Sequence, residues 1–180
     1  MDIQIESRLN LENIDRNINE YRSSLNEMET KISASNIIDL LTSIKREITS
    51  KGPYKNVTFF EAANRIMTDL VILYGVKDLL SGKYPNIIFP EYVVEFGNEN
   101  KNPFDIMAEY KEERLIGEAF NVSKSLFQGK KSTALKKLNH DQSIDDKTIR
   151  ILMYNRDAVE IGFSPKYIKN LYHIVVDIIL

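Results

Sequence analysis

Residues 103–131 read PFDIMAEYKEERLIGEAFNVSKSLFQGKK, and this stretch decides the fold. Two short apolar runs, 106–108 and 115–122, stand on either side of a charged turn. This pattern predicts two antiparallel strands joined by a tight connection, with a helix from about Ser123. Asp105 begins the first strand and Glu118 lies in the second, so the hairpin is expected to bring two carboxylates together.

This acidic pair, Asp105 and Glu118, suits one hard, oxygen-seeking cation such as Mg²⁺. Without a cation the two groups are costly to hold together, because like charges at short range raise each other's pKa. The residues by themselves therefore predict a mixed α/β domain that carries one acidic site.

The elements around the hairpin follow from periodicity and capping residues. Thr58 and Glu61 form a capping box at the start of a long helix that is apolar nearly all round, as expected of a helix buried between layers. Glu95 and Glu99 lie at the end of the strand predicted over residues 87–96. They could belong to the acidic site, but we interpret them as a solvated strand end. After residue 57 the predicted order is helix, three strands, helix and strand, then a last strand, over residues 58–80, 87–96, 106–108, 115–122, 123–138, 149–154 and 172–180.

The order acidic residue, hairpin, acidic residue, helix resembles the active-site region of the PD-(D/E)XK nucleases, the superfamily that includes most type II restriction endonucleases. Residues 104–105 (Phe-Asp) stand where that family has Pro-Asp, and residues 118–120 (Glu-Ala-Phe) stand where it has (Asp/Glu)-X-Lys. The resemblance covers residues 58–155. It implies a restriction-endonuclease-like αβββαβ core with a mixed central sheet. Phe120 departs from the pattern, because it occupies the place of the catalytic lysine.

The activity that the resemblance implies is metal-dependent hydrolysis of DNA. Asp105 and Glu118, helped by the Ala119 carbonyl, would hold Mg²⁺ on the scissile phosphate. A lysine would orient the attacking water and offset the charge that develops in the transition state. Since Phe120 cannot do this, the charge must come from the next helix.

Among the lysines of that helix, Lys131 falls in the middle of the apolar face, whereas Lys136 and Lys137 point elsewhere. A lysine on an apolar stripe either extends to solvent or finds a buried anionic partner. We therefore expect Lys131 to join Asp105 and Glu118 in catalysis, with Lys124 as second choice. Lys124 and Lys130 are the candidates for contacts with nucleic acid.

Composition limits the other possibilities. The chain has 180 residues, 43% of them hydrophobic, which is enough for one domain with a core and an extension. Its 24 basic and 26 acidic residues are nearly balanced, so any contact with DNA must come from a local patch. The absence of cysteine and of signal-peptide or membrane-spanning patterns predicts a cytoplasmic protein without a membrane contact.

Residues 1–50 are predicted to form a separate helical arm before the α/β domain of residues 51–180. Two structures are possible for this arm: a helical hairpin that packs on its own domain, or a coiled coil that makes a homodimer. A boundary at residues 51–53 (Lys-Gly-Pro) follows it. The arm carries a heptad seam of Leu11, Ile14, Ile18, Tyr21, Leu25, Met28 and Ile32.

Three functions are compatible with these features. The first is a Mg²⁺-dependent, restriction-endonuclease-like DNA endonuclease. The second is a catalytically inactive relative that binds DNA or a partner and oligomerises through its N-terminal helices, and Phe120 favours it. The third is a coiled-coil interaction protein whose α/β domain carries no site.

Overall fold

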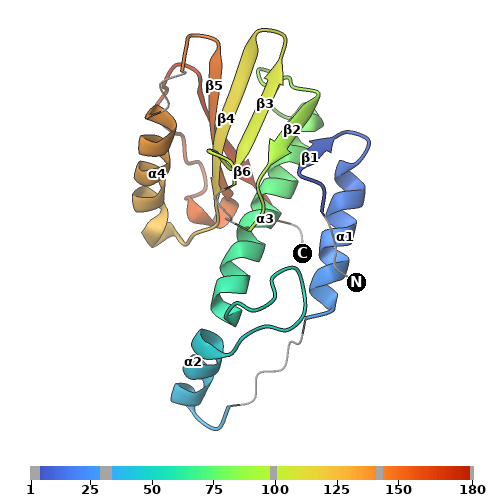
Figure 1. Ribbon diagram of the computed structural model, residues 1–180. Coiled ribbons are helices and arrows are strands. Elements are labelled where there is room, and N and C mark those ends of the chain that lie inside the picture. Colours follow the sequence, from blue (N-terminus) through green and yellow to red (C-terminus); the bar gives the residue numbers. More distant parts are fainter. Residues whose placement is uncertain (1–4, 29–33, 98–100, 141–143, 179–180) are drawn as a thin grey trace.

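The computed structural model describes residues 5–28, 34–97, 101–140 and 144–178. Six strands form one sheet in the order β1-β2-β3-β4-β5-β6 (Figure 1). The strands are β1 Arg8–Asn10, β2 Glu91–Val94, β3 Ile106–Tyr110, β4 Glu113–Phe120, β5 Thr148–Asn155 and β6 Leu171–Val176. Pairings from β1 to β4 are antiparallel, and β4, β5 and β6 are parallel. The protein is therefore α/β with a mixed sheet, as the sequence predicts.

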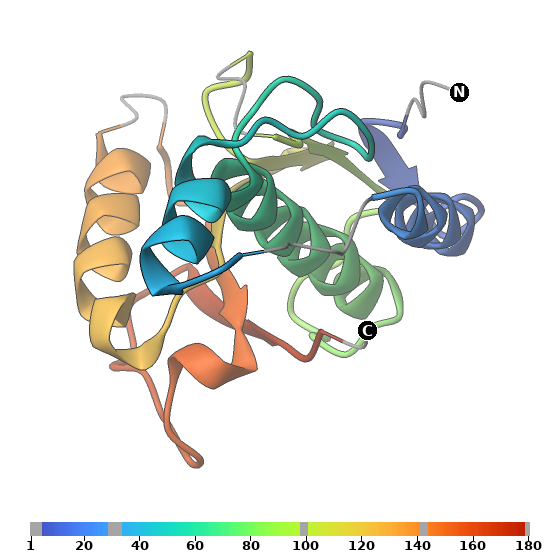
Figure 2. The same cartoon turned by 90° about the horizontal axis from the view of Figure 1, so that it is seen from below.

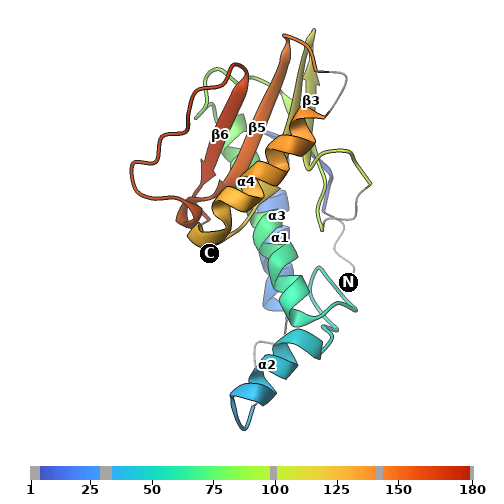
Figure 3. The same ribbon diagram turned by 90° about the vertical axis from the view of Figure 1, so that its left-hand side faces the viewer.

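Two helices cover opposite faces of the sheet (Figures 1 and 3). α3 packs across β4, β5 and β6 on one face, and α4 packs on β4 and β5 from the other. α1 packs against α3, and α2 also contacts α3. The helices are α1 Ile14–Asn26, α2 Ile37–Arg46, α3 Phe59–Leu80 and α4 Lys124–Asn139, with a 3₁₀ turn at Arg156–Ala158.

Alternation along β4 separates two cores. Leu115 and Ala119 belong to the core beneath α3, whereas Ile116 and Phe120 belong to the core beneath α4. Side chains on a strand point to opposite faces with a period of two. Glu118 therefore lies on the same face of the sheet as Ile116 and Phe120. Because α4 covers this face, a side chain of α4 can reach Glu118.

The predicted order of elements after residue 57 is confirmed. Thr58 caps α3 by accepting a hydrogen bond from the Glu61 backbone N–H at 3.2 Å. Val71, Leu73 and Val76 of α3 are fully buried, as expected of a helix between layers. The local patterns thus identified both the start of this helix and its position inside the fold.

The N-terminal residues differ from the prediction of a separate arm over residues 1–50. Residues 8–10 form β1 at the edge of the sheet, and α1 packs on α3. Ile14, Ile18 and Tyr21 of the seam are buried in the core beneath α3. From Ile14 to Met28 the seam therefore has a partner within its own chain, whereas Leu11 is exposed. Ile32, its last member, lies outside the described residues.

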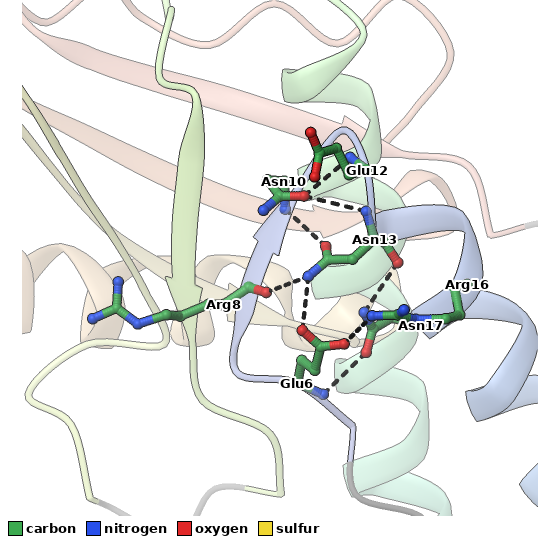
Figure 4. Close-up of polar contacts among 7 residues, drawn as sticks. All are labelled: Glu6, Arg8, Asn10, Glu12, Asn13, Arg16 and Asn17. Carbon is green, nitrogen blue, oxygen red and sulfur yellow. Dashed lines mark hydrogen bonds and ion pairs between the residues drawn. The ribbon is translucent and has the colours of Figure 1, made fainter.

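A polar network attaches β1 to α1 (Figure 4). Asn13 Nδ2 donates to the Arg8 carbonyl at 2.8 Å and to Glu6 Oε2 at 3.0 Å. Asn17 Oδ1 accepts from the Glu6 backbone N–H at 3.0 Å. Asn10 Oδ1 accepts from the backbone N–H of Asn13 at 3.2 Å. These contacts hold a strand of only three residues against the helix that follows it.

α2 stands away from the sheet (Figures 1 and 3). None of its residues is buried, and Ile37, Ile38 and Leu41 are exposed. A homodimer formed through the N-terminal helices stays a prediction. Within the described ranges, no helix combines the length and the apolar character needed to cross a membrane.

Candidate functional site

The acidic pair lies at the end of the β3–β4 hairpin. Ile106 pairs with Gly117, and the same antiparallel register puts Asp105 beside Glu118. Asp105 Oδ2 accepts a hydrogen bond from the Ala119 backbone N–H at 2.8 Å. The hairpin thus brings the two carboxylates together, as the sequence predicts.

Burial disfavours the charged forms of both carboxylates, and a neighbouring carboxylate adds to this effect at each of them. Glu118 is 8% exposed, and its burial, followed by the neighbouring Asp105 carboxylate, raises the pKa of Glu118 to about 7. Burial also raises the pKa of Asp105, although the Ala119 N–H and the Lys137 charge oppose the change. Two such groups need a shared proton or a positive partner near neutral pH.

The positive partner is Lys137 of α4, whose Nζ lies 2.7 Å from Glu118 Oε1. This corrects the expectation for Lys131. The Nζ of Lys131 lies 5.5 Å from the centroid of the Phe127 ring. Its charge acts on His173, where burial first and Lys131 second lower the pKa to about 4.

The physical reason is the rotation of α4 on the sheet. The buried stripe of this helix contains Phe127, Ala134 and Leu138, as its periodicity predicts. With about 100° between successive residues, Lys137 lies on one flank of this stripe and Lys131 on the other. The carboxylates lie beside the flank that carries Lys137.

A cleft of about 670 Å³ opens at the carboxyl end of β4. Its floor contains the acidic pair and Glu95, and its walls come from the first half of α3 and from α4. Figure 2 looks toward this end of the sheet, with α4 on one side and α3 further across. The wall residues include Phe60, Arg65 and Asp69 of α3, and Leu126, Lys130 and Lys137 of α4.

Glu95 is held by the loop that follows it. Its carboxylate accepts from the backbone N–H of Lys101 at 3.2 Å and of Asn102 at 2.5 Å. Its own N–H donates to the Asp105 carbonyl at 2.9 Å. Glu95 is buried rather than solvated, so our interpretation of it as a solvated strand end is wrong; Glu99 lies outside the described residues.

Asp69 is a buried carboxylate of α3 that our sequence analysis missed. Its Oδ2 accepts from Tyr21 Oη at 2.6 Å and from Tyr54 Oη, and its Oδ1 accepts from the Gly97 N–H at 3.1 Å. Burial raises its pKa to about 6, against the opposing effect of the two hydroxyls. Its position directly before the apolar run of residues 70–76, in a helix predicted to be buried, was the signal that could have revealed it.

The remaining candidates are divided between the cleft and the surface. Lys130 is exposed and lines the cleft, whereas Lys124 forms an ion pair with Glu160 at 2.9 Å. Phe120 stacks on Tyr154 with ring centroids 5.7 Å apart, so it packs in the core at the position where the PD-(D/E)XK motif has lysine. A contact of Lys130 or Lys124 with nucleic acid stays a prediction.

Comparison with known protein families, with curated proteins and with solved structures finds no match to this chain. Within the described part of the chain, no three His, Cys, Asp or Glu side chains converge on a common point where a metal could bind. The acidic pair with Lys137 is therefore the candidate site in this cleft.

Proposed function

We propose that this protein is a metal-dependent nuclease that hydrolyses phosphodiester bonds of DNA on a restriction-endonuclease-like core. One observation carries the proposal: Asp105 and Glu118 lie side by side on the floor of a cleft, and Lys137 contacts Glu118. The order helix, three strands, helix, strand supports it.

The donor set fits Mg²⁺. Proteins commonly hold this ion through one or two carboxylates, and waters and substrate phosphate oxygens complete the coordination. Asp105 and Glu118 would be those two carboxylates. Burial raises the pKa values of both, and the Asp105 carboxylate adds to the rise at Glu118, so a cation bound between them would stabilise their charged forms. When bound, the ion would polarise a phosphoryl oxygen and lower the pKa of the attacking water.

Lys137 supplies the charge that Phe120 lacks. Its side chain is 45% exposed, so its ammonium can move from Glu118 toward a phosphate group that enters the cleft. There it would offset the negative charge that develops in the transition state. The Ala119 N–H keeps Asp105 oriented during this change.

α4 also provides a local basic patch. It contains five lysines and no acidic residue, although the whole chain has a net charge of −2. Lys130 and Lys137 of this helix line the cleft. Positive side chains beside the acidic pair would attract a phosphate backbone that the carboxylates alone would repel.

The test is cleavage of plasmid DNA by purified protein with Mg²⁺ and with a chelator. Asp105→Asn should abolish Mg²⁺-dependent cleavage, and Lys137→Ala should slow it on the order of 10²-fold or more. Lys136→Ala is the matched control, because this neighbouring lysine does not line the cleft. Equal losses from Lys136→Ala and Lys137→Ala would contradict the assigned role.

A second candidate is an inactive relative that binds nucleic acid without cleaving it. The burial of Phe120 in an aromatic cluster with Phe127 and Tyr154 favours it, because that place holds no charge. It predicts binding of DNA, no Mg²⁺-dependent cleavage, and equal behaviour of wild type and Asp105→Asn. Cleavage that disappears in Asp105→Asn would exclude it.

A further inference from the structure

We propose that the cleft accepts a single nucleic-acid strand and excludes an intact duplex. This inference rests on the proposed function and names its substrate class. Three features of the cleft carry it: the depth of the acidic pair, the exposed apolar side chains of its walls, and the lysines beside them.

The acidic pair is recessed. Glu118 is 8% exposed, and α3 and α4 both wall the cleft in which it lies. The volume of about 670 Å³ is within the range of roughly 300–1,000 Å³ that pockets for single small molecules occupy. A flexible strand can insert one or two nucleotides into such a space. A strand that is paired with its complement cannot insert a nucleotide into this space unless that nucleotide first unpairs.

The walls carry large apolar side chains that face solvent. Phe60, the second residue of α3, is 44% exposed, and Leu126 in the first turn of α4 is 61% exposed. Both line the cleft. Unpaired bases have apolar faces that stack on such side chains, whereas the bases of a duplex are already stacked on one another. The two side chains therefore suit a strand whose bases are unpaired.

Positive charge lies beside these apolar side chains. Lys45 Nζ is 3.2 Å from the centroid of the Phe60 ring, and Lys130 lines the α4 wall. A basic groove interleaved with exposed apolar or aromatic side chains is the combination by which proteins bind single strands without sequence preference. The phosphates would lie along the lysines and the bases against Phe60 and Leu126.

The experiment compares a fluorescein-labelled 12-nucleotide single strand with the same sequence as a duplex, by anisotropy in a chelator. The single strand should bind at least tenfold more tightly. Phe60→Ala should weaken its binding about tenfold, and Phe60→Trp should preserve it. Tyr110→Ala is the matched control: Tyr110 is 41% exposed, does not line the cleft, and lies at the opposite end of β3 from Asp105.

Phe60 and Tyr110 are both exposed, so we expect both alanine variants to keep the fold. Thermal melting of each variant checks this. Equal or tighter binding of the duplex, or unchanged binding by Phe60→Ala, would overturn the inference. Preferential cleavage of duplex in Mg²⁺ would overturn it while leaving the proposed nuclease intact. Selective binding of the single strand without any Mg²⁺-dependent cleavage would support the inference and refute the nuclease.

Discussion

Replacing Glu118 by glutamine should make the protein more stable at pH 8. Glu118 is buried beside Asp105, so its ionised form destabilises the fold. Glutamine has nearly the same shape and carries no charge. Its introduction leaves Lys137 without its partner, but that side chain is 45% exposed and water can solvate it.

The magnitude follows from the pKa of Glu118, which is 4.5 ordinarily and about 7 in the folded protein. Between these values the folded state keeps a proton that the unfolded state has lost. Raising the pH then lowers the free energy of unfolding by about 1.4 kcal/mol per pH unit. The total is about 3 kcal/mol, it is reached near pH 7, and it is absent below about pH 4.5.

Urea unfolding followed by circular dichroism at pH 5, 6, 7 and 8, without divalent cations, measures the effect. The advantage of Glu118→Gln over wild type should grow with pH and level off above about pH 7. Glu113→Gln, an exposed position on the same strand, should stay within about 0.5 kcal/mol at every pH. A Glu118→Gln protein that is less stable than wild type at pH 8, or an advantage that does not change with pH, would refute the reasoning.

Further predictions concern the scaffold and the metal. Asp69→Ala should cost about 3 kcal/mol or more in urea unfolding, because Tyr21 and Tyr54 lose their acceptor; Asp69→Asn should cost less. Gly117→Ala should cost about 1–3 kcal/mol, because the added Cβ would lie 2.4 Å from Ile151 Cγ1. A chain that lacks residues 1–26 should fail to show a cooperative thermal transition, since β1 and α1 contribute to the core. Mg²⁺ at ten times its dissociation constant should stabilise wild type by about 1.4 kcal/mol and should not stabilise Asp105→Asn, measured by thermal shift.

Local sequence signals determined the hairpin and the helices that flank it. The two apolar runs with a charged turn between them specify β3 and β4, and the turn fixes their register. That register is sufficient to bring Asp105 to Glu118. The capping box at Thr58 and the apolar surface of α3 likewise specify a buried helix without reference to any distant residue. The acidic pair and its surrounding scaffold could therefore be predicted from neighbours in the chain.

Only the tertiary structure decided the partners of the N-terminal residues. A heptad seam indicates that one side of a helix packs against another surface, and that surface can belong to the same chain or to another chain. Here α3 covers Ile14, Ile18 and Tyr21. β1 is only three residues long, too short for its alternation to predict a strand. The hydrogen bonds of Asn13 and Asn17 hold these N-terminal residues against α1, and this places β1 beside β2.

The tertiary structure also determined which lysine of α4 contacts Glu118. Helical periodicity determined that Phe127 and Leu138 face the sheet, and this is confirmed. It could not determine which flank of that stripe lies beside the carboxylates, because that depends on where the helix crosses the sheet. The packing of α4 on β4 and β5 puts Lys137 beside Glu118 and Lys131 beside the Phe127 ring. The sequence thus determined that α4 could supply a lysine, and side-chain packing between the layers selected which one.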